Sequence, residues 1–211
     1  MPAAGSGDRL GLGPKAFLEL DGRPLLAWIA DKVRRVAGEV LIAVPANRLV
    51  EARELCTGCT CIAGGATRQE TVARLVEIST RPLILIQDAA RPFASVALLR
   101  EVCFQAQVHG VAGAFLSPGV PVARIDPDGW VAQAFPARGS AIFQAPQAFR
   151  RDILKGVLDH AAREGWDEQS TMQLVLRLGI PVRAVPGEAQ NIKVTTPQDW
   201  RLAQLFKEFL T

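Results

Sequence analysis

Short aliphatic runs alternate with helical segments along most of this chain, and this alternation restricts its fold more than any other feature. The runs fall at residues 40–44, 59–62, 83–86, 111–116 and 182–185. Short aliphatic runs bounded by turn residues are typical of strands buried on both faces. Because strands separated by helices pair in parallel and are covered on both sides, we expect an α/β fold with a doubly wound, mostly parallel sheet.

The helical segments are predicted from apolar residues that recur every three or four positions. They cover residues 25–36, 48–55, 70–79, 95–107, 151–164 and 170–178, with a last helix after Thr196. In that last helix Thr196 is the expected N-cap, Pro197 takes the first helical position and Asp199 lies near the positive end of the helix dipole.

The alternation stops between residues 120 and 143, where two short extended runs, VARI and WVAQAF, flank the turn DPDG. This pattern predicts a β-hairpin. A lone hairpin has too little apolar surface to be stable in water, so we expect it to pack on something else, such as a second subunit. At 211 residues, the chain is then expected to form one domain, residues 1–211, with a projecting β-arm at about 120–143.

The amino-terminal segment 2–15, PAAGSGDRLGLGPK, carries four glycines and only three charged residues, Asp8, Arg9 and Lys15. Glycines let backbone N–H groups turn toward a ligand, and two cations can neutralise phosphate charge, so this segment predicts a phosphate-binding loop. It matches neither a Walker A loop nor a dinucleotide-binding fingerprint. A flexible terminus with solvated charges is the alternative. Only Met1 precedes Pro2, so the strand expected before the loop is either a stub or begins in native residues upstream.

Three further motifs follow predicted strands or resemble one. The turn Gly64-Gly65 leads into a helix that carries Thr71, and its polar groups can bind the edge of a nucleobase. Asp88 and Arg91 follow the run at 83–86, where a carboxylate can orient an acceptor or hold magnesium and an arginine can bind phosphate. Lys193 lies in the strand-like run NIKVT. Each motif also has a structural alternative: a tight turn, an ion pair and a solvated lysine.

Composition excludes several classes of function. Lys plus Arg number 24 and Asp plus Glu 21, with no run of like charge, so binding of nucleic acid is not expected. The apolar runs are far shorter than the roughly 20 residues of a membrane span, and no signal peptide begins the chain, which indicates a cytoplasmic protein. Cys56, Cys59 and Cys61 lack the partners of a zinc site, so we expect structural thiols.

Taken together, PAAGSGDR with Lys15, GGATRQETV, DAARP, QAPQAF and NIKVTTPQD resemble, in order and spacing, the 2-C-methyl-D-erythritol 4-phosphate cytidylyltransferases of the non-mevalonate isoprenoid pathway. The resemblance implies a sheet of the nucleotide-diphospho-sugar transferase type and a homodimer formed through the β-arm. It also implies transfer of CMP from CTP, with Mg²⁺ bound mainly through the CTP phosphates and Asp88 as a further candidate ligand.

The same resemblance implies roles for individual residues. Arg9, Lys15 and Lys193 are the expected catalytic residues, and the expected substrate-binding residues are Ala3, Ala4, Gly5, Ser6, Gly65, Thr71, Asp88, Arg91 and Arg138. The first loop is expected to bind the triphosphate, and Gly65 and Thr71 are expected to bind cytosine. Asp88, Arg91 and Lys193 are expected to line the acceptor side, with Arg138 as the arginine of the arm.

The sequence departs from the family at three positions on the acceptor side. Val122, Ala145 and Trp166 stand where the family has threonine. A hydrogen bond to a charged group contributes about 1.5–3 kcal/mol, so the acceptor is less constrained than CTP. Two alternatives therefore remain: a cytidylyltransferase for another polyol phosphate such as ribitol 5-phosphate, and a nucleotide-binding protein without turnover.

Overall fold

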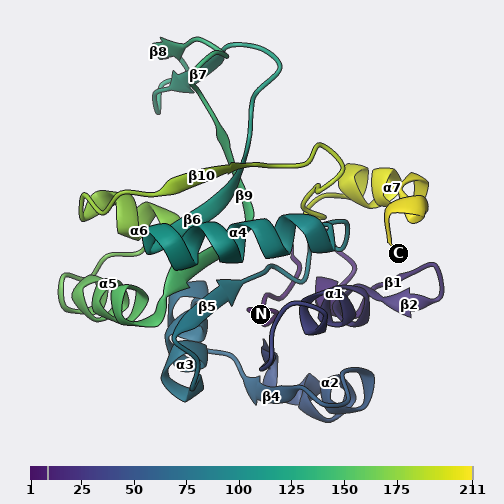
Figure 1. Cartoon of the computed structure of the whole chain (residues 1–211). Coiled ribbons are helices and arrows are strands. Elements are labelled where there is room, and N and C mark those ends of the chain that lie inside the picture. Colours follow the sequence, from purple (N-terminus) through teal and green to yellow (C-terminus); the bar gives the residue numbers. More distant parts are fainter. Residues whose placement is uncertain (9, 211) are drawn as a thin grey trace.

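The computed structural model describes residues 1–8 and 10–210 (Figure 1). Within them the strands are β1 (Glu19–Leu20), β2 (Arg23–Pro24), β3 (Leu41–Val44), β4 (Thr60–Ala63), β5 (Leu83–Ile86), β6 (Val111–Leu116), β7 (Val122–Ile125), β8 (Val131–Phe135), β9 (Ile142–Arg150) and β10 (Arg183–Pro186). The α-helices are α1 (Leu25–Arg34), α2 (Leu49–Leu55), α3 (Arg68–Ile78), α4 (Val96–His109), α5 (Arg151–Arg163), α6 (Thr171–Arg177) and α7 (Pro197–Leu205). Short 3₁₀ turns lie at Lys15–Phe17, Ala46–Arg48 and Lys207–Phe209.

The largest sheet has the strand order β10-β6-β9-β5 and is mixed rather than mostly parallel. β10 runs parallel to β6, whereas β9 lies between β6 and β5 and is antiparallel to both. The sequence pattern did not predict β9, because Pro146 cannot donate a ladder hydrogen bond and argues against a central strand. The register between β6 and β9 shifts between Gly113 and Phe115, beside Pro146, and this irregularity accommodates the proline.

Helices cover both faces of this sheet, as the alternation predicted. On one face α4 packs Leu98, Val102 and Ala106 against small residues of β6 and β9. On the other face α3, α5 and α6 contribute apolar side chains around Phe149 of β9. Figure 1 shows α4 crossing the front of the sheet, with α5 and α6 at one end.

A second piece of sheet pairs β3 with β4 in parallel and does not join β5. The first residues of the chain pair with β3 through short hydrogen bonds: Ala3 N–H donates to Ala43 O at 2.7 Å, and Ala43 N–H donates to Met1 O at 3.0 Å. The Met1 amino group donates to Leu41 O at 2.7 Å, and its burial lowers its pKa to about 5. The strand expected before the first loop is therefore a stub in this structure.

A cavity of about 400 Å³ separates β3 from β5 beside this stub. Its lining is largely apolar and comes from α1, α3 and the two strands, including Val33, Leu41, Val72 and Leu85. No hydrogen bond between backbone groups of β3 and β5 crosses it within the described part of the chain. The two pieces of sheet are therefore held together by side-chain packing.

The local signals in the sequence placed the helices well. Ser95 caps α4 by accepting a hydrogen bond from Leu98 N–H, and Gly110 ends that helix with a φ of 88°. Thr196 and Asp199 form a capping box at the start of α7, with Pro197 at the first helical position. α7 therefore begins where its capping residues predicted, and α4 begins one residue after the predicted start at residue 95.

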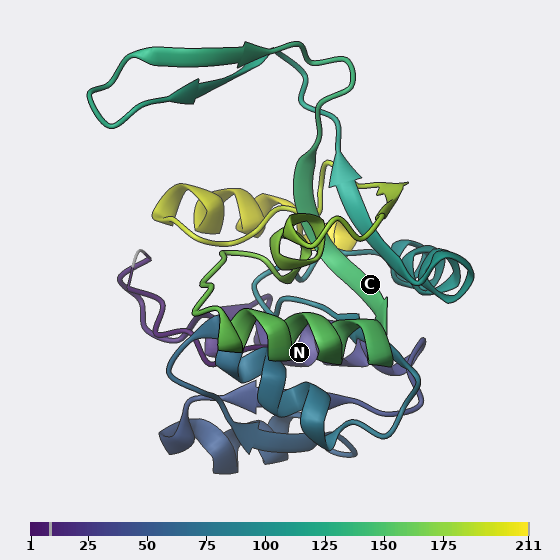
Figure 2. The same cartoon turned by 90° about the vertical axis from the view of Figure 1, so that its left-hand side faces the viewer.

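β7 and β8 form the predicted hairpin, which projects away from the rest of the protein (Figures 1 and 2). Its tip and second strand expose large apolar side chains, with Trp130 74% and Val131 65% exposed. Every residue of β8 is exposed. Nothing in the described part of the chain covers this apolar surface.

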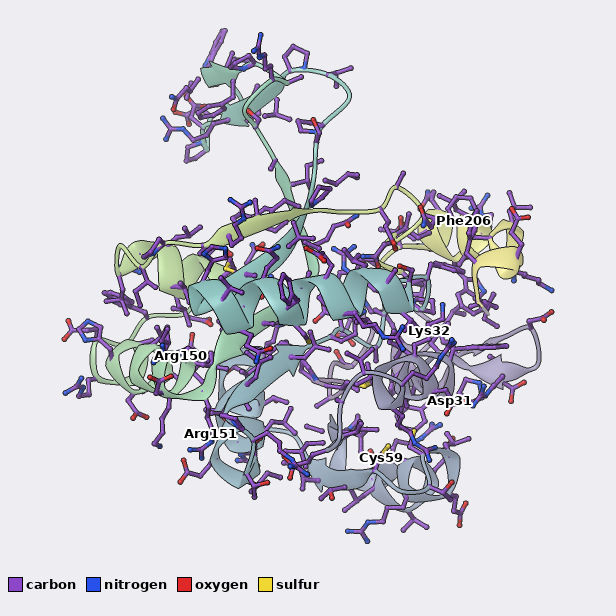
Figure 3. The ribbon with its side chains drawn as sticks, in the orientation of Figure 1. Asp31, Lys32, Cys59, Arg150, Arg151 and Phe206 are labelled. Atoms are coloured by element: carbon purple, nitrogen blue, oxygen red, sulfur yellow. The ribbon has the colours of Figure 1, made fainter. Side chains whose placement is uncertain are left out.

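Lys32 of α1 joins the carboxyl-terminal end to the loop after β5. Its side chain is only 4% exposed, and its ammonium donates to Pro92 O at 3.1 Å and Phe209 O at 2.9 Å. Burial lowers the pKa of this lysine. Figure 3 shows Lys32 on the side of α1 that faces the segment carrying Phe206. This buried cation therefore fixes the end of the chain against the core.

Candidate active site

A cavity of about 230 Å³ gathers most of the predicted site residues at the carboxyl ends of the strands. The predicted residues that line it are Ala3, Ala4, Gly5, Lys15, Gly65, Thr71, Asp88 and Lys193. They come from four separate segments of the sequence. The first loop, the double-glycine turn, the segment after β5 and the NIKVT run therefore meet at one cavity.

The first loop folds back on itself at Gly7, which has a φ of 84°. A Cβ on Gly7 would lie 1.9 Å from the carbonyl oxygen of Gly13, so only glycine fits there. Ser6 lies outside the cavity lining, and its hydroxyl donates to Asp8 Oδ2 at 2.6 Å. The predicted catalytic Arg9 lies outside the described residues.

Lys15 opens the 3₁₀ turn at the end of the loop and lines the cavity. The positive charge of Lys15 also acts on Asp199. Burial raises the pKa of the Asp199 carboxyl, but hydrogen bonds from Thr196 and the charge of Lys15 lower it, and the net shift is downward. The loop thus delivers one cation to the cavity without placing it in the apolar core.

The double-glycine turn packs directly on the first loop. A Cβ on Gly64 would lie 2.3 Å from Ala4 Cβ, so this glycine allows the two backbones to approach. Gly65 N–H donates to Thr71 Oγ1 at 2.9 Å, and the Thr71 hydroxyl donates to Thr67 O at 2.8 Å. Thr71, predicted to contact a base, therefore uses its hydroxyl hydrogen to hold the turn itself.

Asp88 follows β5 and lies between two cations. Its Oδ2 is 2.9 Å from Lys193 Nζ, and its Oδ1 is 3.2 Å from Arg68 Nη2. Burial alone would raise the pKa of the carboxyl, but Lys193 and Arg68 outweigh it and hold the pKa well below its usual range. The carboxylate is therefore charged at neutral pH and shared between both partners.

Asp88 is the one carboxylate among the described residues that line the cavity. Because each of its oxygens already faces a cation, direct coordination of Mg²⁺ would require Arg68 or Lys193 to move away. The donor set fits a metal held mainly through ligand phosphates, as predicted, better than one held by Asp88. No group of three or more His, Cys, Asp or Glu side chains suited to a metal occurs within residues 1–8 and 10–210.

Arg91 and Arg138 do not line the cavity. The Arg91 guanidinium donates to Asn191 O at 2.6 Å, and burial lowers its pKa. It therefore ties the loop after β5 to the NIKVT segment. Arg138 is exposed in the connection between β8 and β9, away from the cavity of its own chain.

The three positions that lack the threonines expected from the resemblance lie in different surroundings. Trp166 stacks edge-on against His160 and lies under the Arg177 guanidinium, 3.9 Å from its ring centre. Ala145 is buried, and its carbonyl accepts a hydrogen bond from Asn191 at 2.7 Å. Val122 begins β7 at the base of the arm.

Arg68 is a site residue that the sequence pattern did not reveal. It lines the cavity and contacts both Asp88 and Thr171. A local signal was present, because Thr67 caps α3 by accepting from Glu70 N–H and so fixes Arg68 at the first helical position, in the turn that also holds Thr71. Its partners are 20 and 103 residues away, however, and no local pattern reveals them.

Two expectations drawn from composition concern the cysteines and membrane spans. Cys56 and Cys61 are buried, and burial raises the pKa of the Cys56 thiol to about 12. Among the described helices none has the length and apolarity needed to cross a membrane.

Comparison with known proteins agrees with this geometry. Residues 1–208 match the family model of 2-C-methyl-D-erythritol 4-phosphate cytidylyltransferase. The Thermus thermophilus protein of that name is 42% identical over 205 residues, covering 97% of this chain and 93% of the relative. The Deinococcus radiodurans protein of that name is 39% identical over 204 residues, with 97% and 86% covered.

A solved structure resembles the fold over almost the whole chain. The crystal structure of the Thermus thermophilus 2-C-methyl-D-erythritol 4-phosphate cytidylyltransferase has a TM-score of 0.81 and 36% identity, covering 97% of this chain and 95% of that one. The family match spans every residue that lines the cavity. The chain therefore belongs to the 2-C-methyl-D-erythritol 4-phosphate cytidylyltransferase family.

Proposed function

We propose that this chain transfers CMP from CTP to 2-C-methyl-D-erythritol 4-phosphate, giving 4-diphosphocytidyl-2-C-methyl-D-erythritol and pyrophosphate. The observation that carries the proposal is the meeting of Lys15 and Lys193 in one cavity, together with the loop and the turn that pack through Ala4 and Gly64. A cavity with two lysines and close glycine backbone suits a nucleoside triphosphate.

In the reaction an oxygen of the acceptor phosphate attacks the α-phosphorus of CTP, and the bond to pyrophosphate breaks. Both reactants are anions, so their alignment and the neutralisation of their charge are the main requirements. Lys15 and Lys193 supply positive charge at the cavity, and no nucleophile from the protein is needed. Bound Mg²⁺ neutralises part of the triphosphate charge.

The residue roles follow the family resemblance and not the cavity lining alone, since Ser6, Arg91 and Arg138 lie outside that lining. The triphosphate is assigned to the first loop, the base to the double-glycine turn, and the acceptor to the side of Asp88. The residues concerned are Ala3, Ala4, Gly5, Ser6, Arg9 and Lys15 for the triphosphate, Gly65 and Thr71 for cytosine, and Asp88, Arg91, Arg138 and Lys193 for the acceptor.

The proposal is tested by pyrophosphate release with CTP, Mg²⁺ and 2-C-methyl-D-erythritol 4-phosphate, with ribitol 5-phosphate assayed in parallel. The second acceptor is included because Val122, Ala145 and Trp166 lack the hydroxyl groups expected from the family resemblance. Faster release with ribitol 5-phosphate would reassign the acceptor. Tight CTP binding without product from either acceptor would support a binding protein without turnover.

Lys15→Ala is expected to reduce turnover by about 100-fold or more, because one of the two lysines of the cavity is lost. The matched control is Lys207→Ala, since Lys207 forms a surface pair with Asp21 and its side chain is 50% exposed. Pyrophosphate release measures both variants. A Lys15→Ala protein with normal release would remove Lys15 from the catalytic residues.

We also propose that the chain acts in the cytoplasm as a single domain and forms a homodimer through the β-arm. The exposed apolar side chains of Ile125, Trp130 and Val131 support burial against a second copy. Light scattering should show a dimer for the native protein. Replacement of these three residues by serine should give monomers with an unchanged circular dichroism spectrum, and a native monomer would refute this arrangement.

A further inference from the structure

Arg68 is the one cation among the described cavity residues for which the family resemblance gave no role. It is the first residue of α3, and its side chain is 30% exposed. Its guanidinium joins two points far apart in the sequence: Nη2 donates to Asp88 Oδ1 and Nη1 donates to Thr171 Oγ1, each at 3.2 Å. Arg68 is therefore anchored at both ends of its fork.

Arg68 and Lys193 compete for the same carboxylate. Lys193 Nζ is 2.9 Å from Asp88 Oδ2, and Arg68 occupies the other oxygen. Because the two cations divide one negative charge between them, Asp88 does not neutralise Lys193 fully. The Lys193 side chain also stays 40% exposed, on the cavity side of the pair.

We propose that Arg68 is a positioning residue that draws part of the Asp88 charge away from Lys193 and so leaves the Lys193 ammonium able to bind substrate phosphate. This rests on the proposed function. Without Arg68 the carboxylate would turn to Lys193 alone, and the ion pair would compete with phosphate for the ammonium. The arginine lies three residues before Thr71, so the turn assigned to cytosine and the cation assigned to the acceptor are linked through one short segment.

The kinetic test compares Arg68→Gln with native protein. We expect kcat to fall by about tenfold or more, with less change in the KM for CTP, since the effect acts on charge at the acceptor side. Arg68→Lys, which keeps the charge but not the fork, should recover part of the loss. In an Asp88→Asn background, Arg68→Gln should cost little more, because both changes act through the same carboxylate.

The control is Arg150→Gln. Arg150 ends β9 near α5 and forms a surface pair with Asp152 in which the side chains are 55% and 63% exposed (Figure 3). The kcat of Arg150→Gln should equal that of the native protein. Equal kcat for Arg68→Gln and native protein, or strictly additive losses with Asp88→Asn, would overturn the proposal.

A second measurement does not depend on turnover. An amine-acetylating reagent followed by peptide mass mapping gives the labelling rate of Lys193 relative to Lys207. In Arg68→Gln, Lys193 should react about threefold or more slowly, because the undivided carboxylate pairs more strongly with the Lys193 side chain and shields it from the reagent. In Asp88→Asn it should react faster than in the native protein.

An unchanged or faster Lys193 rate in Arg68→Gln would refute the role of Arg68 whatever the substrates are. Slower labelling of Lys193 in Arg68→Gln, together with a native protein that releases no pyrophosphate, would support the role of Arg68 and reject the proposed function instead. The two failures are thus separate.

Discussion

Replacement of Asp88 by asparagine removes the negative charge that Lys193 and Arg68 share while keeping the shape of the side chain. At an effective dielectric of 20, the pair at 2.9 Å has a gross attraction of about 6 kcal/mol and the pair at 3.2 Å about 5 kcal/mol. Desolvation of the buried carboxylate cancels much of this, and removing one partner of a buried pair typically costs about 3–5 kcal/mol. Since Lys193 and Arg68 are partly exposed, we expect Asp88→Asn to lose about 2–3 kcal/mol.

Thermal unfolding at pH 7 measures this loss as a decrease in Tm of roughly 5–10 °C for a chain of this size. Its dependence on pH gives a second check. The folded-state pKa of Asp88 is lowered, so its contribution is complete above the ordinary aspartate pKa of about 4 and is lost as the pH falls toward the lower folded value. The Tm difference should therefore stay constant from pH 7 to about 5 and shrink below about 4.

The matched control is Asp152→Asn, which breaks the exposed pair with Arg150 and should leave the Tm at its native value, because solvent screens this pair. Equal Tm values for Asp88→Asn and native protein at pH 7 would refute the stabilisation of the folded protein by the ion pairs of Asp88. A difference that widens on acidification would refute the sign of the pKa shift.

Two further variants test the packing of the loop and of the chain end. Gly7→Ala should weaken CTP binding in calorimetry by about tenfold or more, because the new Cβ meets Gly13 O. Gly11→Ala should weaken CTP binding less, since its Cβ meets nothing within 4 Å. Equal CTP affinities for the two variants would contradict this reasoning. Lys32→Met should lower the free energy of unfolding in urea by about 1–3 kcal/mol, because the buried Pro92 O and the part-buried Phe209 O lose their donor. An unchanged free energy of unfolding would contradict this prediction, and would mean that the desolvation cost of the buried ammonium equals the gain from its two hydrogen bonds.

Local sequence signals predicted the helices and the cavity loops, since a capping residue such as Thr196 or a glycine such as Gly64 acts within a few residues. β9 was missed because its place in the sheet depends on long-range pairing with β6 and β5, which overrides the local effect of Pro146. The two-residue strands β1 and β2 are too short for any periodic signal. Arg68 was missed for a similar reason, because its role comes from Asp88 and Thr171 and not from its neighbours in sequence.

The cavity between β3 and β5 has a mechanical consequence for the active site. Lys15 belongs to the loop tethered to β3 through Ala43, whereas Asp88 follows β5 on the other side of the gap. No continuous ladder among the described strands fixes the separation of these two walls, so the width of the proposed nucleotide pocket depends on the packing of α1, α3 and α4 across the gap. The side chains that line this cavity therefore determine how far apart Lys15 and Asp88 lie, although they are remote from both residues in the sequence.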